Sequence, residues 1–375
     1  ARHDGQAVTC NDFVKAMEAA NNVDLSQFRR WYEQAGTPVL TVKQSYDATE
    51  RTLTLTINQH CPATPGQTIK EPLHIPVTVG LIYKDGSIAT CKLEGNVVVK
   101  ADQAILQLIQ AEQSFVFEDL KEQPVVSILR GFSAPVKLIM ERNLEELAFL
   151  LRHDCDTFNR WEAGQQLAGQ IISGLITDIK NGRDLQLNPN IINAVKQIME
   201  QSWDDLSYFS LLLSLPSETY LAEQMEVVDV EAIHAAREFV LLTLAEQLQV
   251  QFKKLYRDCH REESGKFDAG AIGRRRIKNT CLAYLGRLEQ QEVQQWSQQQ
   301  FDTAKNMTDQ IAALAVVVNS SHPAKKECLA SFYEQWQDEA LVIDKWFALQ
   351  ASSHNEDTFI TVQKLMQHPT FDLRN

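Results

Sequence analysis

Histidine and cysteine are the side chains that most often hold a catalytic metal or act as a nucleophile. The nine histidines stand at positions 3, 60, 74, 153, 234, 260, 322, 354 and 368, and none has another histidine four residues away. A zinc site of the H-E-x-x-H type needs such a pair, because residues i and i+4 share one helix face. The seven cysteines contain no C-x-x-C, which argues against a zinc ribbon or a redox pair. The sequence therefore predicts no catalytic, cofactor-binding or metal-binding residue in this chain.

Four stretches combine reactive side chains at closer spacing. Neighbouring residues of His153–Asp156 point in different directions on a helix, so a helix junction is favoured over a metal site. Cys259 and His260 lack a third group, and an inert cysteine is favoured over a thiolate pair. Gly265–Lys266 lacks the upstream glycine of a phosphate-binding loop. The basic run Gly273–Lys278 could bind an anion or RNA, but a solvated helix start or intramolecular ion pairs fit an acidic chain better.

Two further motifs lie in the C-terminal half. Asn306–Asp309 leads into the apolar run Ile311–Val318, so a helix start or a helix–helix contact is favoured over contact with a substrate. In Lys345–Gln350, Trp346 and Leu349 stand three residues apart and share a helix face. This spacing predicts that Trp346 is a core residue. The sequence gives neither motif a chemical role.

The charge balance and the hydropathy pattern exclude several classes of protein. The chain has 49 acidic and 36 basic residues, so its net charge is 36 − 49 = −13, whereas a nucleic-acid-binding protein needs a basic surface. The longest apolar run, Ile311–Val318, is far shorter than the roughly 20 residues of a membrane span. The N-terminal residues also lack the apolar segment of a signal peptide. We therefore expect a cytoplasmic protein with reduced cysteines, binding neither nucleic acid nor membranes.

Residues 1–36 read as two helices. Thr9 and Asp12 predict a capping box for the first, and Asp24 is expected to cap the second. The apolar stripe of the first helix is Phe13, Val14 and Met17, and that of the second includes Phe28, Trp31 and Tyr32. Gly36 and the pair Thr37–Pro38 then end the helix and force an extended exit, so a strand begins at Val39.

Residues 37–141 read as antiparallel β structure with one packed and one wet face. Leu53, Leu55 and Ile57 alternate with threonines, and the segments 73–79 and 136–140 alternate in the same way. The turn signals are Pro65–Gly66, Asp85–Gly86 and Glu94–Gly95. The spacing predicts a β-sandwich of about seven or eight strands. Pro76 indicates an edge position, because proline cannot donate to a strand ladder.

Residues 142–375 read as helix throughout, with breaks at Asn181–Gly182, Pro189, Pro216, Gly265 and Pro323. The expected helices after the stripe Leu144–Leu151 are 158–179, 191–201, 230–255, 271–288, 302–318 and 324–351. The glutamine-rich segment Gln290–Gln300 is expected to be a solvated helix. About a dozen helices without a fixed sequence period predict a solenoid-like or curved helical bundle.

Four segments resemble bacterial aminopeptidase N, a zinc-dependent aminopeptidase family of the gluzincin class. They are Phe28–Pro38, Phe132–Leu138, Asn306–Asp309 and Asp344–Gln350, and they occur in the family's order across nearly the whole chain. The resemblance implies three parts: the tail of a catalytic domain at 1–36, a β-sandwich spacer at 37–141, and a helical domain at 142–375 that covers the catalytic chamber. It also implies that both ends are cuts in a longer protein.

The zinc ligands, the base and the oxyanion-stabilising tyrosine of that family match no residue of this chain. The resemblance therefore implies that zinc belongs to the parent enzyme, which removes N-terminal residues from peptides, and that this chain alone binds no zinc and is inactive. Its partners would be its own catalytic domain and the parent's peptide substrates. An apolar surface around Phe28, Trp31 and Tyr32 is expected where the catalytic domain packs, with self-association as a consequence.

An adaptor or scaffold is the alternative. A β-sandwich followed by an α-solenoid could equally bind partners on a concave face, because a fold does not fix a function. An open reading frame upstream that encodes H-E-x-x-H and a later glutamate would favour the enzyme, and a start codon near Ala1 would favour the scaffold.

Overall fold

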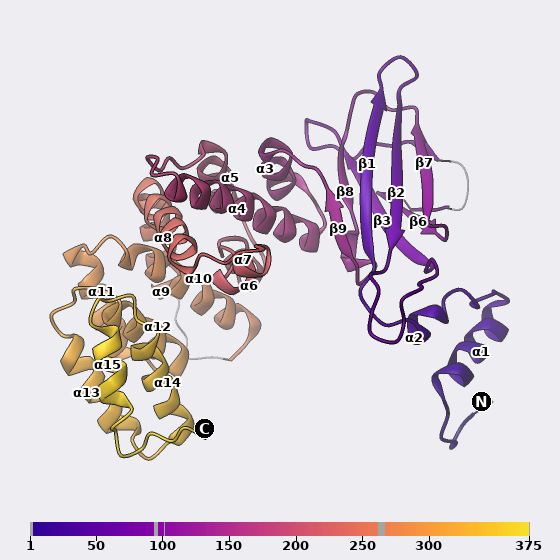
Figure 1. Ribbon diagram of the computed structural model, residues 1–375. Coiled ribbons are helices and arrows are strands. Elements are labelled where there is room, and N and C mark those ends of the chain that lie inside the picture. The colour runs from indigo at the N-terminus through magenta and orange to yellow at the C-terminus, as the bar shows by residue number, and fades with distance from the viewer. Residues whose placement is uncertain (1–2, 94–96, 101, 262–266, 375) are drawn as a thin grey trace. The chain divides into compact units, whose positions relative to one another are not determined.

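The structure of the protein, a computed structural model, describes residues 3–93, 97–100, 102–261 and 267–374 (Figure 1). Of residues 97–100 and 261 it describes the backbone alone. The chain folds into two compact units, Ala1–Gln166 and Leu167–Asn375, and the division falls inside helix α4 (Thr157–Lys180). Within the described ranges, no helix combines the length and the apolar character that a membrane crossing requires.

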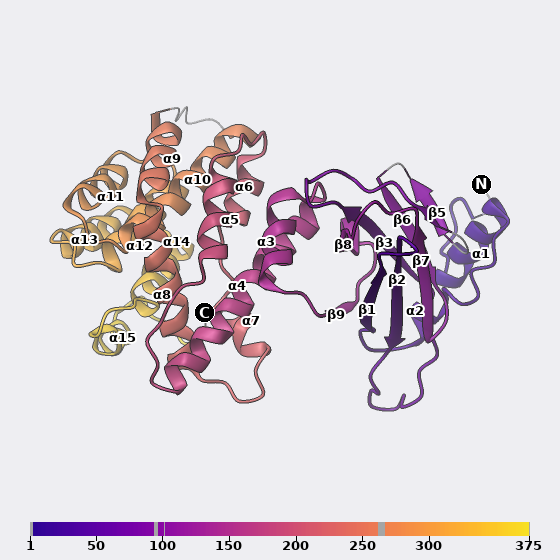
Figure 2. The same cartoon turned by 90° about the horizontal axis from the view of Figure 1, so that it is seen from above.

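Two facing sheets form a β-sandwich in the first unit (Figures 1 and 2). The first sheet has the order β4-β7-β2-β1-β9 and the second β5-β6-β3-β8. The nine strands within the described residues are β1 (Val39–Asp47), β2 (Thr52–His60), β3 (Ile75–Ile82), β4 (Lys92–Leu93), β5 (Val97–Lys100), β6 (Gln103–Leu108), β7 (Glu112–Glu118), β8 (Val125–Ile128) and β9 (Lys137–Met140). The predicted antiparallel sandwich is confirmed, with two differences: nine strands are described where about seven or eight were predicted, and β9 pairs parallel to β1.

Alternating side chains fill the space between the sheets. Leu53, Leu55 and Ile57 of β2 are fully buried, while the threonines between them are only half-buried. In β3, Ile75 and Val77 are also fully buried. The predicted strand phase is therefore confirmed, because a shift of one residue would have turned these side chains to solvent.

The prediction that Pro76 lies on an edge strand is wrong. Pro76 does, however, lie in a part of its strand that has a partner strand on one side only. β3 is a central strand, paired with β6 on one side and β8 on the other. The ladder to β8 starts only at Val79, and the N–H of Thr78 donates to Ser133 Oγ instead (3.0 Å). Since residues two apart direct their N–H groups to the same edge, the nitrogen of Pro76 faces the stretch without a partner strand.

Two of the three predicted turns lie in the described residues, and both have a glycine in the left-handed region. Gly66 has φ +77° between the bridged residues Thr64 and Gln67, and Gly86 has φ +86° after Asp85. A glycine adopts this conformation without the steric cost that a Cβ would add. The third predicted turn, Glu94–Gly95, lies outside the described residues.

The N-terminal segment contains one regular helix, α1 (Cys10–Asn21), and one short turn of helix, α2 (Arg30–Glu33). The predicted capping box is confirmed, because Thr9 and Asp12 bond each other's backbone N–H groups. Asp24, however, does not cap the second helix. Its Oδ1 accepts from the N–H of Ser26 (2.8 Å), a local turn six residues before α2 begins. A short aspartate side chain favours such turns as readily as helix caps.

The residues around α2 attach this segment to the sandwich. Trp31 Nε1 donates to the carbonyl of His74 (2.9 Å), and Gln34 exchanges two hydrogen bonds with the backbone of Glu71 (2.6 and 2.9 Å). Trp31 is half-buried against the sandwich core, whereas Tyr32 is 56% exposed. Trp31 is thus used inside the unit and is not part of a free apolar surface, which corrects the expected role of this aromatic group.

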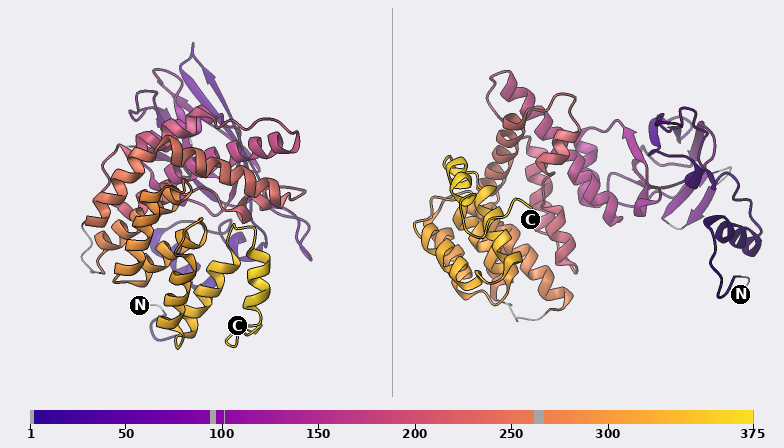
Figure 3. Two further views of the ribbon diagram at one scale, coloured as in Figure 1. Left: turned by 90° about the vertical axis from the view of Figure 1, so that its left-hand side faces the viewer. Right: turned by 60° about the horizontal axis from the view of Figure 1, so that its bottom comes forward.

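After β9 the described chain is helical, as predicted (Figure 3). The helices are α3 (Leu144–His153), α4 (Thr157–Lys180), α5 (Pro189–Met199), α6 (Leu206–Leu212), α7 (Glu218–Glu223), α8 (Val230–Gln247), α9 (Gln249–Arg261), α10 (Ala269–Gly286), α11 (Gln291–Thr303), α12 (Met307–Val318), α13 (Lys325–Trp336), α14 (Ala340–Ala351) and α15 (Thr358–Leu365). In the second unit, α10 packs against α6, α8, α9, α11 and α12, which makes it the central helix of that unit (Figure 2).

Three differences from the expected helices have local causes. The expected helix 230–255 is two helices, because the chain breaks at buried Leu248, where neither glycine nor proline marks the end. The expected helix 324–351 is likewise interrupted after Trp336. Helices α6, α7 and α15 have eight residues or fewer, too few to show a clear 3.6-residue period.

The glutamine-rich segment forms α11, but it is not solvated on all sides. Val293, Ser297 and Gln300 are almost fully buried, so one face of α11 packs inside the unit. The break predicted at Gly265 lies outside the described residues, as does the pair Gly265–Lys266. The break predicted at Asn181–Gly182 is confirmed, with Gly182 at φ +64°.

Candidate functional site

A buried ion pair lies at the end of the sandwich. Arg130, on the short 3-10 helix η1 (Arg130–Phe132), donates to Asp154 Oδ1 at 2.9 Å, and both side chains are almost completely buried. Arg130 also donates to Ser127 Oγ (2.8 Å), which accepts a second hydrogen bond from Asn159 of α4 (2.8 Å). Such a pair needs hydrogen bonds to offset the cost of removing two charges from water.

This arrangement explains the stretch His153–Asp156. Asp154 faces Arg130, and Asp156 accepts from the backbone N–H of Gly131 (2.8 Å) and of Asn159 (2.9 Å). The stretch lies between α3 and α4, so the predicted helix junction is confirmed. Its carboxylates hold the end of the sandwich and do not converge on a metal position.

Replacing Gly80 by alanine should destabilise the protein, because the Arg130 guanidinium lies against this backbone. A Cβ on Gly80 would clash with Arg130 Cζ, so the guanidinium would have to move away from its buried partners. Overpacking of this kind typically costs about 1–3 kcal/mol. We expect Gly80→Ala to lower the urea midpoint of unfolding correspondingly.

Gly174→Ala is the matched control, since a Cβ at this exposed position in α4 would meet nothing within 4 Å. Alanine in a helix interior is favoured over glycine by about 0.5–1 kcal/mol, so the midpoint should rise slightly. Equal midpoints for the two variants would show that the Arg130 side chain can move away from Gly80 without loss of stability.

A second buried ion pair joins two motifs of the helical part. Lys278 Nζ of α10 lies 2.8 Å from Asp309 Oδ2 of α12, and both side chains are almost completely buried. Asp309 also accepts from Asn279 Nδ2 (3.0 Å) and Asn306 Nδ2 (3.0 Å), while Asn306 Oδ1 accepts from the N–H of Asp309 (2.9 Å). Asn306 is thereby the N-cap of α12.

The network extends to the neighbouring helices. Gln300 of α11 donates to Asn279 Oδ1 (2.8 Å) and to the carbonyl of Asp309 (3.0 Å), and it accepts from the Tyr256 hydroxyl of α9 (3.2 Å). Four helices, α9 to α12, are therefore fixed to one another by polar contacts. The prediction of a helix start and helix–helix contact for Asn306–Asp309 is confirmed, as is the ion pair predicted for Gly273–Lys278.

The motif Lys345–Gln350 is also structural. Trp346 is 9% exposed, and its Nε1 donates to the carbonyl of Leu329 in α13 (3.0 Å). Its ring lies against Tyr333, Phe347 and His368. The prediction that Trp346 is a core residue is confirmed.

Three of the seven cysteines, Cys259, Cys281 and Cys328, are buried. None of the seven forms a disulfide bond. Burial raises the pKa of Cys281 well above its ordinary value. Cys259 is buried, and the ring of His260 stacks on Tyr256 (centroids 5.6 Å apart). The inert cysteine predicted at 259 stays a prediction.

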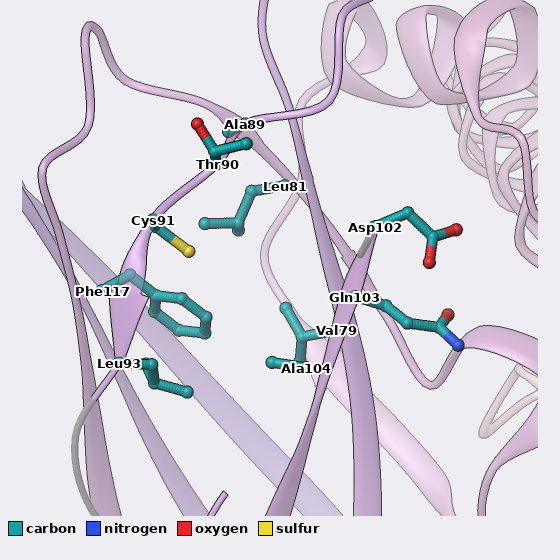
Figure 4. A pocket seen from close by; sticks show the side chains of 10 residues that line it. All are labelled: Val79, Leu81, Ala89, Thr90, Cys91, Leu93, Asp102, Gln103, Ala104 and Phe117. Atoms are coloured by element: carbon teal, nitrogen blue, oxygen red, sulfur yellow. The ribbon is translucent and has the colours of Figure 1, made fainter. Parts of the chain in front are cut away.

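One cavity of about 370 Å³ opens between the two sheets of the sandwich (Figure 4). Its wall includes the apolar side chains of Leu81, Leu93 and Phe117. Cys91 and Asp102 are among its other lining residues. Burial raises the pKa of the Cys91 thiol. Among the lining residues that the structure describes, the cavity therefore combines apolar side chains with a cysteine whose pKa is raised.

One cluster of metal-ligating side chains stands out in the second unit. His234 and Glu238 of α8 and His354, which follows α14, each present a ligand atom, and these atoms lie within 4.8 Å of one another. The His234 and His354 rings are stacked, with centroids 4.9 Å apart. His234 Nδ1 lies 2.8 Å from Glu218 Oε1 of α7.

The spacing of the histidines does not predict this cluster, because no two histidines are four residues apart. The sequence signal is the pair His234 and Glu238, which are four residues apart in a helix and so share a face. His354 comes from a distant part of the chain, and only the packing of the helices brings it to α8.

Two family models together match nearly the whole chain. Residues 36–141 match a domain of unknown function, DUF3458, described as an Ig-like fold. Residues 144–375 match a second one, DUF3458_C, described as ARM repeats. The predicted β-sandwich followed by a solenoid-like helical domain is confirmed by these matches.

Curated relatives match over the full chain. The chain is 38% identical over 374 residues to aminopeptidase N of Escherichia coli, 36% over 377 residues to that of Haemophilus influenzae, and 37% over 374 residues to that of Caulobacter vibrioides. Each match covers 100% of this chain and 42% of the relative.

A solved structure agrees with the curated relatives. The crystal structure of Legionella pneumophila aminopeptidase A in complex with aspartic acid superposes with a TM-score of 0.81 at 28% identity, over 99% of this chain and 42% of that chain. The chain therefore belongs to the DUF3458_C family and is homologous to the C-terminal, non-catalytic region of aminopeptidase N.

Proposed function

We propose that this chain acts as the non-catalytic part of a larger aminopeptidase. The complete protein would remove N-terminal residues from peptides with a zinc-activated water. Residues 142–375 would cover the catalytic chamber and restrict access to peptides, and residues 37–141 would be the spacer. Residues 1–36 would be the tail of the catalytic domain. The protein would act in the cytoplasm, without binding nucleic acid.

The observation that carries this proposal is the extent of the match. The match to the E. coli relative, 38% identical over 374 residues, spans all three proposed parts and corresponds to less than half of that relative. No residue of this chain fits the zinc set of the resembled family, because its sequence contains no H-E-x-x-H. The proposed chemistry therefore belongs to a part of the protein outside these residues.

The surface of the N-terminal helix supports a further domain as its partner. Phe13 and Met17 lie four apart on α1 and are 53% and 40% exposed, and Val8 and Val23 at its ends are nearly half exposed. Apolar side chains gathered on one helix are typical of an interface. The proposed occupant is the catalytic domain of the same polypeptide.

We expect the chain alone to self-associate through this face, and Phe13→Asp to reduce the association. A charge on the apolar face would have to be desolvated in any apolar contact, which opposes association. Sedimentation velocity over a range of concentrations measures the effect. Ile69→Asp is the control, because Ile69 is 81% exposed and lies away from α1 in the sequence. Association that persists in Phe13→Asp and weakens in Ile69→Asp would contradict this assignment.

The gene sequence tests the proposal itself. Reading the codons upstream of Ala1 should reveal an open frame that encodes H-E-x-x-H and a later glutamate. A start codon near Ala1 would instead favour the adaptor or scaffold, the alternative that the architecture alone allows. The matches to aminopeptidases give that alternative no better support.

A further inference from the structure

We propose that His234, Glu238 and His354 form a binding site for a divalent transition metal, most suitably zinc. The three residues supply two imidazoles and one carboxylate, a ligand set that suits zinc. The inference rests on the residues of this chain alone and does not depend on the proposed function. It departs from the sequence-based prediction that this chain binds no metal.

The helix and a fixed loop bring the ligands together. His234 and Glu238 project from one face of α8 because they are four residues apart. The N–H of His354 donates to Asn319 Oδ1 (2.9 Å), and Asn355 Nδ2 donates to the carbonyl of Val318 (2.7 Å). The segment after α14 is thereby anchored to the end of α12, which holds His354 over α8.

The hydrogen bonds that the three ligands make to other residues resemble those found in metal sites. A ligating histidine usually bonds a carboxylate with its other ring nitrogen, which fixes the ring and raises the basicity of the ligand. Glu218 Oε1 occupies this position, 2.8 Å from His234 Nδ1, and leaves Nε2 for a metal. Arg287 Nη1 bonds Glu238 Oε2 in the same supporting way.

Glu238 retains an oxygen for the metal. Among the described residues, its Oε1 is buried and has no hydrogen-bond partner. A buried carboxylate oxygen without a partner is costly, and a bound cation would satisfy it. With Glu218, Glu238 and Arg287 the surroundings carry one net negative charge, which favours a cation.

The three ligand atoms would have to move closer together to bind zinc. Ligand atoms around tetrahedral zinc lie about 3.3 Å apart, given bonds of about 2.0–2.1 Å, whereas here they lie within 4.8 Å. Because His354 is exposed, we expect its ring to turn out of the stack on His234 on binding, so that both rings and Glu238 direct a ligand atom to one point. A water would complete the coordination.

Isothermal titration of the 375-residue chain with zinc chloride tests this site. We expect one zinc per chain. His354→Ala and Glu238→Gln should each weaken binding by at least about tenfold, since even supporting residues cost about 10–100-fold. His60→Ala is the matched control, because His60 is an exposed histidine of the sandwich. The zinc affinity of the His60→Ala variant should equal that of the unchanged chain. Circular dichroism of each variant checks that it is folded.

Cobalt substitution provides a second readout. Co²⁺ bound by two imidazoles and a carboxylate should give visible absorption bands that are lost in His354→Ala and changed in Glu218→Gln, which removes the charge facing His234. Equal zinc affinity in all variants, loss of binding in His60→Ala as well, or no bound zinc would overturn the proposal.

Discussion

Asp309→Ala should destabilise the helical unit by about 3–5 kcal/mol, the usual cost of removing one partner from a buried ion pair. Lys278 would keep its charge in a site where it is almost completely buried, 2.8 Å from the lost carboxylate. Asn279 and Asn306 would lose an acceptor at the same time. Urea unfolding followed by far-UV circular dichroism measures the change in the free energy of unfolding.

The control is Asp258→Ala on the surface pair Lys254–Asp258, whose side chains are 77% and 50% exposed. An exposed i,i+4 pair contributes about 0.3–0.5 kcal/mol, so the control should hardly move the midpoint. A double variant, Lys278→Met with Asp309→Leu, separates charge from packing, because it leaves no unpaired buried charge. If Asp309→Ala were as mild as Asp258→Ala, the network would not hold the four helices together.

Trp346→Ala should cost about 3–5 kcal/mol, the usual range for truncation of a buried aromatic side chain. The indole is 9% exposed, and it contacts Tyr333 of α13 and His368 beyond α15. Its removal would leave a cavity between these helices and free the carbonyl of Leu329, which now accepts from Nε1. Chemical denaturation should show a clearly lower midpoint.

Leu341→Ala in the same helix is the comparison, because Leu341 is 78% exposed. Surface substitutions usually stay within about 0.5 kcal/mol. An unchanged midpoint for Trp346→Ala would show that the ring is peripheral and would reopen a role for it on a substrate-facing surface.

Local sequence patterns predicted the parts of the fold in which one face is buried. The alternation at Leu53, Leu55 and Ile57 fixed the strand phase, because only one phase buries three large aliphatic side chains. Thr9 and Asp12 predicted the first helix start, because the capping box is complete within four residues. Asp24 shows the limit of this approach, since the same side chain serves a turn or a cap.

Contacts between distant residues could not be predicted in this way. Lys278 and Asp309 stood in two separate motifs, and only the packing of α10 on α12 makes them partners. The cluster His234–Glu238–His354 needed both the helix spacing and the return of the chain after α14. Side chains from different helices meet because of tertiary packing, which leaves no period in the sequence.

The most direct test of the proposed function is the rate of hydrolysis of an aminoacyl anilide, with zinc added. It should be measured for the 375-residue chain and for the product of its complete reading frame. We expect no turnover from the chain alone, even where it binds zinc, because it lacks the H-E-x-x-H set. The longer product should hydrolyse the substrate and lose activity with a chelator. Chelator-sensitive turnover by the chain alone, or none by the longer product, would contradict the proposal.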